Sequence, residues 1–240
     1  MTVTDALLRP LLDADAAGPL ITYYDDATGE RVELSTLTLA NWAAKTANLL
    51  RDELGVAPGD RVSVLLPAHW QTAAVLLGAW WCGAVVDDPA APEPADSVVA
   101  LTTAARLSEV SDAPEQVVLS LDAFGAPVPD LPVGVTDYAT AVRVQADAFA
   151  APRVGDDAGA LAGRTVRDVL DAGRTSGAAQ GLTASDRVLS AAAWDSAARL
   201  TDGLLAVLAA GASLVQVTHP DPALTDRRVV TERVTRTVAL

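Results

Sequence analysis

Apolar residues along the chain form two similar series, each with a short apolar run, a long apolar helical segment and a second short run. The first series spans residues 55–89 and the second spans residues 181–221. In each, a glycine stands five residues before an Asp-Arg-Val sequence, and a Gly-Ala pair precedes the second run. Self-similarity of this kind indicates repeated structural units. We therefore predict two similar halves, residues 1–150 and 151–240, that form one compact unit.

Short apolar runs between turn residues predict strands, and segments with apolar residues three and four positions apart predict helices. In the first half we expect strands at residues 21–24, 31–34, 62–66, 84–86, 98–101 and 116–120, and helices at 35–54, 69–82 and 137–149. In the second half we expect strands at 187–190, 213–217 and 235–240, and helices at 165–172, 196–209 and 223–233. Strands that alternate with helices through short links are typical of an α/β fold with a mostly parallel sheet in each half.

Composition and charge exclude several classes of function. The net charge of −14 comes from 17 basic and 31 acidic residues, which disfavours binding to nucleic acid or to anionic membranes. Half of the 240 residues are hydrophobic, yet we find no apolar run of about 18 residues that could span a membrane. The N-terminus has no basic segment typical of a secretion signal. Cys82 is the single cysteine, so we expect neither a disulfide nor a metal cluster, and we expect a cytoplasmic protein.

The first apolar series carries a resemblance to a known family. The residues that carry it are Leu34-Ser35, Leu39, Gly55, Gly59-Asp60-Arg61-Val62, Leu66-Pro67 and Gly83-Ala84. In order and spacing they resemble the opening of the adenylate-forming superfamily, which includes acyl-CoA synthetases, peptide-synthetase adenylation domains and luciferases. The resemblance covers most of residues 20–240 but only the first half or so of a full family member. It implies the α/β fold of the first part of the large N-terminal domain of that family.

The family activates carboxylates with ATP through a Gly/Ser/Thr-rich loop ending in Pro-Lys-Gly, and this chain departs from that pattern. The spacing from Asp186 places the loop near residues 151–161, which read APRVGDDAGAL. This segment contains no lysine, serine or threonine, and Asp156 and Asp157 carry negative charge where phosphates would bind. A second candidate, residues 175–181, follows a predicted helix, and we interpret it as the end of that helix and a turn. Lys45, the only lysine, lies on the first predicted helix.

Other candidate residues are few. The resemblance implies an acyl pocket at the start of the second crossover helix, where this chain has Trp194, Asp195 and Ser196. His69 and His219 lack the spacing of metal ligands, so we interpret them as loop or helix-end residues.

Two acidic patterns and the remaining aromatic residues have structural interpretations. Asp87 and Asp88 end a predicted strand, where aspartates are usually solvated. The Asp-Arg pairs that follow Gly55 and Gly181 are expected to be turn residues at the entry to strands. Trp70, Trp80 and Trp81 belong to the most apolar helix and are expected in the core or at an interface.

Three hypotheses follow. We favour a truncated relative of the acyl-CoA synthetases that binds a partner or small molecule, has no catalytic activity and needs no cofactor. Alternatively, the chain is an acyl-activating half enzyme that uses ATP and Mg²⁺ together with a second chain. The third alternative is a structural or interaction protein that pairs with an unknown protein or forms a homodimer.

Overall fold

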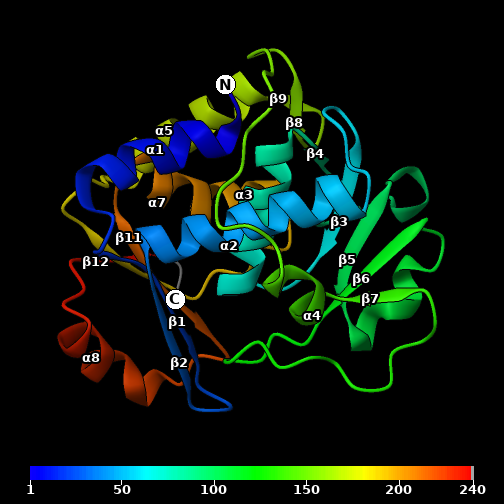
Figure 1. Cartoon of the computed structure of the whole chain (residues 1–240). Helices are drawn as coiled ribbons and strands as arrows, with labels where there is room; N and C mark the ends of the chain where they lie inside the picture. Colours follow the sequence, from blue (N-terminus) through cyan, green and yellow to red (C-terminus); the bar gives the residue numbers. More distant parts are fainter. Residues whose placement is uncertain (239–240) are drawn as a thin grey trace.

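Two β-sheets with helices between them form the framework of the protein (Figure 1). The computed structural model describes residues 1–238. The five-stranded sheet has the order β12 (Arg236–Val238), β10 (Arg187–Ser190), β11 (Ser213–Thr218), β1 (Pro19–Asp25) and β2 (Glu30–Ser35). The seven-stranded sheet has the order β7 (Val135–Asp137), β6 (Glu115–Leu119), β5 (Val99–Thr103), β3 (Arg61–Leu65), β4 (Val85–Val86), β8 (Gly159–Leu161) and β9 (Arg164–Thr165). Neighbouring strands are parallel except in the pairs β1–β2 and β8–β9.

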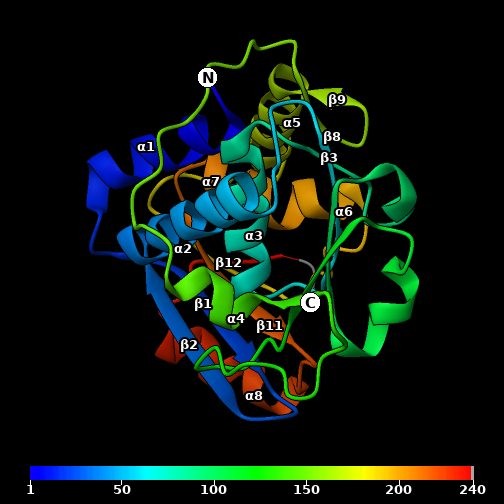
Figure 2. The same cartoon turned by 45° about the vertical axis from the view of Figure 1, so that its right-hand side comes forward.

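Helices fill the space between the sheets and cover part of their outer faces. The α-helices are α1 (Val3–Asp15), α2 (Thr36–Asn48), α3 (Trp70–Cys82), α4 (Tyr138–Arg143), α5 (Val166–Ala179), α6 (Ala197–Leu200), α7 (Ala206–Ala209) and α8 (Pro222–Thr231). Two π-helical segments, η1 (Leu49–Glu53) and η4 (Thr201–Leu205), extend α2 and join α6 to α7. Two 3₁₀-helices flank β5, namely η2 (Pro94–Asp96) and η3 (Ala104–Val110). Helix α3 lies between the sheets with α1 and α2 packed against it, and α8 covers the outer face of the five-stranded sheet (Figures 1 and 2).

The central strands of both sheets are buried on both faces, as strands of parallel sheets usually are. Along β11, Leu214 belongs to the central core and the next residue, Val215, belongs to the outer cluster beneath α8. Along β3, Val64 faces the central core and Leu65 packs on the side of η3. All residues of α3 except Trp81 are buried, which confirms the prediction that this apolar helix lies among other elements.

The predicted repeat is visible in the fold. In each copy, two parallel strands, β3 and β4 or β10 and β11, are joined by a crossover through helix. Gly83 and Gly211 end the two crossovers with positive φ angles of 80° and 77°. A preceding helix packs closely on each crossover, α2 at Gly78 and α5 at Gly177. The two sheets nevertheless mix the halves, because β1 pairs with β11 and β4 pairs with β8, and the division at residue 150 stays a prediction.

Most predicted elements are confirmed, and the differences have physical reasons. Helix α1 was missed, because Pro10 interrupts its pattern, although Thr2 and Asp5 form a capping box at its start. Helix α5 continues to Ala179, beyond the predicted residue 172, so the candidate loop at 175–181 is the end of a helix and a turn, as interpreted. Strands β7, β8 and β9 were also missed because they have only two or three residues each. The predicted last strand is β12, and residues 239–240 lie outside the described part.

Helix α4 ends at Arg143, six residues before the predicted end at 149. The backbone after it crosses α2, where polar side chains of α2 bind its carbonyl groups. Asn48 donates from Nδ2 to the carbonyl oxygens of Ala146 and Ala148, each at 3.0 Å. Those carbonyls are therefore satisfied by another helix, which replaces the hydrogen bonds of a longer α4.

Candidate functional site

A cleft of about 510 Å³ opens where strands of both sheets end. Its walls are the residues at and after the carboxyl ends of β3, β10 and β11, together with the residues that follow β5. Ligands of open α/β sheets bind at carboxyl ends of parallel strands. The volume suits a small organic molecule, because ligand pockets in proteins commonly measure about 300–1,000 Å³. This cleft is therefore the candidate site.

Two of the three residues named from the sequence line this cleft. Trp194 is buried in its wall and Asp195 lies exposed at its rim. Asp195 pairs with Arg199, with the nearer oxygen 2.9 Å from the guanidinium Nη1. Ser196 is the N-cap of α6 and accepts a hydrogen bond from the backbone N–H of Arg199 at 3.3 Å. Ser196 therefore has a structural role as a helix cap. The substrate-binding role of Trp194, Asp195 and Ser196 stays a prediction.

Gln216 is a cleft residue that sequence reasoning missed. Its side chain is 1% exposed, and Nε2 donates to the carbonyl oxygen of Ala192 at 3.0 Å. Its Oε1 atom, like Nε1 of Trp194, has no hydrogen-bond partner among the described residues. The sequence did contain one signal for this residue, namely a glutamine within the otherwise apolar run that forms β11. Both atoms are buried, and Nε1 of Trp194 lies against Gly203 of η4, so they are unsatisfied polar atoms within the wall, where a partner is normally found.

A larger hollow of about 670 Å³ lies at the opposite, amino edge of the five-stranded sheet. Several of its charged residues pair with one another. Glu232 accepts from Arg187 at 2.6 Å and from Arg31 at 3.0 Å, and it also accepts a hydrogen bond from Tyr24 at 2.5 Å. These contacts lower the pKa of Glu232 even though burial alone would raise it. We interpret this hollow as a structural ion-pair network that ties β2, β10 and the end of α8 together.

The segment in which the phosphate loop was expected is acidic and partly irregular. Residues 150–158 form a coil and a turn, and Asp156 and Asp157 are exposed at 3.9 and 3.5 Å from Arg167. The following strands β8 and β9 are joined by only Ala162 and Gly163, with φ angles of 49° and 74°. Positive φ at both central positions is typical of a tight two-residue hairpin.

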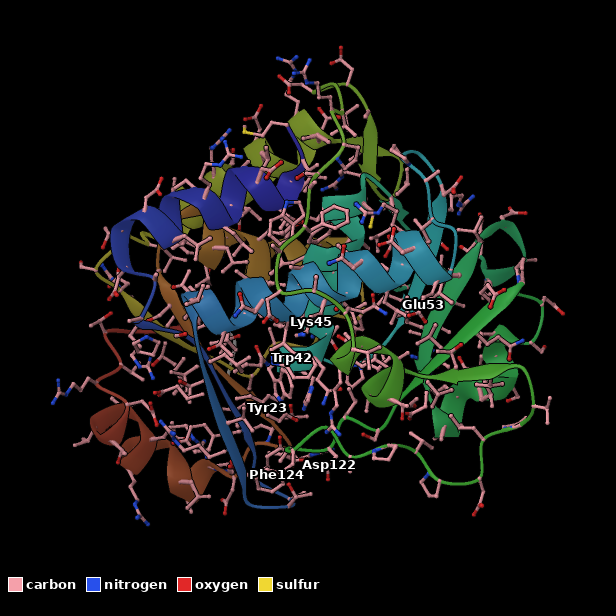
Figure 3. All side chains as sticks on the ribbon, viewed as in Figure 1. Tyr23, Trp42, Lys45, Glu53, Asp122 and Phe124 are labelled. Carbon is pink, nitrogen blue, oxygen red and sulfur yellow. The ribbon has the colours of Figure 1, made fainter. Side chains whose placement is uncertain are left out.

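Lys45 has a structural role. Figure 3 shows it on α2, and its ammonium group donates to the carbonyl oxygen of Gln145 and pairs with Asp147 at 3.0 Å. The lone lysine therefore fixes the loop after α4 to α2.

The expectation for Asp87 was wrong. Its side chain is 4% exposed and not solvated, because it lies at the centre of a hydrogen-bond network at the end of β4. Asp87 accepts from Arg61 at 2.7 Å, from the hydroxyls of Ser63 and Ser97, and from the backbone N–H of Glu93. The residues that surround it come from β3 and from the loop before β5, so no local pattern revealed its burial.

The aspartates of the two Asp-Arg pairs are turn residues, as expected, and the arginines, Arg61 and Arg187, are the first residues of β3 and β10. Asp60 accepts from the backbone N–H of Ala57, and Asp186 accepts from that of Thr183, each at 2.8 Å. Both carboxylates therefore close the turn that leads into a strand, at equivalent places in the two copies of the repeat.

His69 is a helix-end residue, as interpreted, but it is deeply buried. It is the N-cap of α3, where its Nδ1 accepts from the backbone N–H of Gln71 at 3.1 Å. The ring packs edge-on against Tyr23 with centroids 4.3 Å apart. Burial lowers the pKa of His69, although Glu30, with Oε1 3.8 Å from Nε2, opposes this effect. The imidazole is therefore held in its neutral form.

No protein-family model matches the chain. A curated protein of Mycobacterium tuberculosis (strain ATCC 25618 / H37Rv), named "TIGR03089 family protein", is 59% identical over 244 residues. The match covers 98% of this chain and 97% of the relative.

Solved structures share the fold at low sequence identity. An acyl-CoA synthetase of Brucella canis matches with a TM-score of 0.81 and 20% identity, over 99% of this chain and 47% of that one. A benzoate CoA ligase of Burkholderia xenovorans LB400 matches with a TM-score of 0.73 and 22% identity, over 99% and 50%. The N-terminal domain of FACL13 from Mycobacterium tuberculosis matches with a TM-score of 0.72 and 21% identity, over 99% and 62%. The chain thus spans about half the length of the ligases that it matches.

These matches confirm the fold that the resemblance implied, two mostly parallel α/β halves as in the first part of the N-terminal domain of adenylate-forming enzymes. Among residues 1–238, no helix combines the length and the apolar character needed to cross a bilayer.

Proposed function

The chain belongs to the TIGR03089 family and has the fold of the N-terminal part of adenylate-forming enzymes, and from this we propose that it binds an acyl compound without activating it through ATP. The acyl compound is a carboxylic acid or its thioester. The observation that carries the proposal is the cleft at the carboxyl ends of the strands, with the buried Gln216 and Trp194 in its wall. The similar solved structures are named acyl-CoA synthetase and benzoate CoA ligase, which supports this ligand class.

The cleft wall supports a ligand with an apolar body and one polar group. Most of the wall comes from aliphatic residues at the ends of β3, β10 and β11, which favour an apolar acyl group. Gln216 holds an unpaired carbonyl oxygen that is buried, so its side chain must turn toward the cleft before a ligand donor can pair with this oxygen and remove the penalty of an unsatisfied acceptor. An amide N–H in the CoA part of an acyl-CoA thioester supplies such a donor, whereas an ionised carboxylate does not.

The absence of nucleotide chemistry is supported by the segment before α5. Phosphate binding needs several backbone N–H groups and a cation that converge on one point. Residues 150–158 instead expose Asp156 and Asp157, and the β8–β9 hairpin has a connection of two residues. Lys45 is held by the loop after α4.

Calorimetric titration tests the proposal. Benzoate, octanoate and benzoyl-CoA are titrated separately, and Mg-ATP and an acyl-adenylate analogue are titrated alongside. We expect saturable binding of at least one of the first three and no heat from Mg-ATP. Ala193→Trp, at an exposed position in the cleft lining, should weaken that binding at least tenfold by filling the space. Ala178→Trp, at an exposed position of α5 outside the cleft, is the matched control and should bind as the wild type does.

Formation of AMP and pyrophosphate from ATP and a carboxylate would contradict the proposal. It would favour the second candidate, an acyl-activating half that works with another chain, for which the half-length match to the ligases is the specific observation. Co-purification from native extract distinguishes the two, because only the half enzyme needs a stoichiometric partner that supplies the nucleotide site. A partner protein, a homodimer and a cytoplasmic location stay predictions.

A further inference from the structure

Two residues at the carboxyl edge of the five-stranded sheet form a hydrogen-bonded pair beside the cleft. Asp25 is the last residue of β1, and His219 directly follows β11. These strands are parallel neighbours, with Asp25 paired in register with Thr218. The topology therefore brings two residues that are 194 positions apart to the same edge, where Nδ1 of His219 lies 2.9 Å from Oδ1 of Asp25.

The surroundings of Asp25 fix the proton of the imidazole ring. The same oxygen, Oδ1, accepts the backbone N–H of Ala27 at 2.9 Å. Burial alone would raise the pKa of Asp25, but the hydrogen bonds from His219 and from the backbone outweigh it and lower that pKa. The carboxylate is ionised and can only accept, so Nδ1 of His219 carries the proton. In the neutral ring Nε2 is then a free lone pair, on a side chain that is 64% exposed to solvent.

The backbone of His219 is held in an unusual conformation. Its φ angle is +50°, in the left-handed region that only glycine and a few polar residues adopt readily. The next residue is Pro220, which favours an extended conformation in the residue before it. Strain of this kind persists where surrounding structure imposes it, and it concentrates at functional sites. Here it keeps the imidazole against Asp25 at the edge of the sheet.

His219 also belongs to the lining of the cleft in which Gln216 and Trp194 lie. An imidazole that is oriented by a carboxylate and has a free ring nitrogen is the usual apparatus for general acid and base catalysis. Its position at a cleft suited to an acyl group places it where a water molecule can be activated next to a bound carbonyl. Neither residue was assigned a function from the sequence, since they lie far apart in it.

We propose that His219 is the general base of an acyl hydrolase, oriented by Asp25 as a positioning residue, and that its substrates are esters or thioesters of small apolar acids. This proposal rests on the proposed acyl binding in the cleft. In the reaction, Nε2 removes a proton from water as the water oxygen forms a bond to the acyl carbon. The bond from that carbon to the ester oxygen or thioester sulfur then breaks, and Nε2 returns the proton to the leaving group. Water and the acyl compound thus give a carboxylic acid and an alcohol or thiol, and no further reactant is needed.

The charges around the pair are fixed by other contacts. Asp26 accepts from Arg228 and from the backbone N–H of Asp221, and Asp221 caps α8. Asp25 is thus the acidic side chain bonded to the imidazole, and removing its charge is a selective change.

The test measures hydrolysis of p-nitrophenyl butyrate and benzoyl-CoA by the full chain from pH 5 to pH 9, with calorimetric binding of butyrate and benzoate in parallel. We expect a rate at least about 100-fold above buffer, since general acid–base catalysis commonly contributes about 10²–10⁴-fold. The rate should rise with pH as the base loses its proton. The two substrates distinguish oxygen esters from thioesters.

Three variants separate catalysis from folding and from binding. His219→Asn tolerates the positive φ and should abolish hydrolysis while the affinity for benzoate changes less than threefold. Asp25→Asn should lower the rate and move the midpoint of the pH profile to lower pH, because the lost negative charge favours the neutral ring. Asp13→Asn, an exposed aspartate of α1, removes the same charge away from the cleft and should leave rate and profile unchanged.

The outcomes distinguish this proposal from the proposed function. Binding of butyrate or benzoate without hydrolysis overturns the hydrolase and leaves the acyl-binding function standing. Absence of both binding and hydrolysis overturns both. Hydrolysis that survives in His219→Asn overturns the role of His219.

Discussion

Gly78 allows α2 and α3 to approach closely, and Gly78→Ala tests whether this contact is required. A Cβ atom at this position would lie 2.6 Å from Cβ and 2.7 Å from Cγ2 of Thr46, and 3.0 Å from the carbonyl oxygen of Ala43. Carbon atoms in contact are normally about 3.5–4.0 Å apart, so the overlap is about 1 Å. Thr46 cannot turn away freely, because its hydroxyl donates to the carbonyl of Trp42 at 2.8 Å and lies 2.7 Å from the hydroxyl of Tyr138.

The expected loss of stability follows from two opposing effects. Overpacking of a buried site costs about 1–3 kcal/mol, and this site lies at the upper end because backbone and a fixed side chain both resist. Alanine recovers about 1 kcal/mol through its higher helix propensity. We therefore expect a net loss of about 2 kcal/mol in the free energy of unfolding, which corresponds to about 4–8 °C in Tm for a chain of this size.

Urea denaturation followed by circular dichroism, with a thermal scan, measures this loss. The control is Gly155→Ala, because Gly155 lies in a coil and its nearest atom to a new Cβ is 4.0 Å away. That variant should be as stable as the wild type or slightly more stable. If Gly78→Ala equals the wild type in stability, the close approach of α2 and α3 does not constrain the core and the reasoning is refuted.

Three further predictions concern buried titratable groups. Burial lowers the pKa of His69, so the neutral ring stabilises the fold above about pH 6.5, and this stabilisation is lost as pH falls through the lowered pKa. The urea concentration at the midpoint of unfolding should therefore drop from pH 7 to pH 5. The drop should be smaller in His69→Asn. Burial raises the pKa of Cys82 to about 12, so the neutral thiol stabilises the fold below about pH 8.5, and this stabilisation is lost as pH rises toward 12. The Tm of the wild type should therefore fall above pH 9, and it should fall less in Cys82→Ala. Asp87→Ala removes the acceptor shared by Arg61, Ser63 and Ser97 and should cost about 1–3 kcal/mol in urea denaturation, because the buried hydroxyls lose their acceptor while the half-exposed Arg61 keeps its pair with Glu93; unchanged stability would show that water replaces the carboxylate.

Local patterns were sufficient to predict the strand–helix–strand units. In each unit, the glycine before Asp-Arg-Val ends a helix, the apolar run forms a strand, and the Gly-Ala pair leads into the second strand. Each of these effects depends only on neighbours within a few residues. The caps confirm this, since Ser35 accepts from the N–H of Thr38 at the start of α2 as its residue type predicts. The apolar character of α3 likewise predicted that it lies between other elements.

The contents of the site could not be obtained in this way. Trp194 was named because the family resemblance implies an acyl pocket at the start of the second crossover. Gln216 and His219 reach the cleft because β11 ends opposite β3, and Asp25 reaches His219 because β1 inserts beside β11. No spacing in the chain encodes either neighbourhood.

Local sequence was sufficient to predict most elements and their order, because turns, caps and apolar periodicity act over a few residues. Tertiary structure alone decided which distant residues meet. Asp87, which was expected to be solvated, is buried at the centre of a hydrogen-bond network. Helix α4 ends at Arg143, and Asn48 of α2 binds carbonyl groups of the backbone that follows it. The parallel pairing of β1 with β11 formed the Asp25–His219 pair. These contacts depend on strand order and helix packing, which are set by the whole core and not by any single segment.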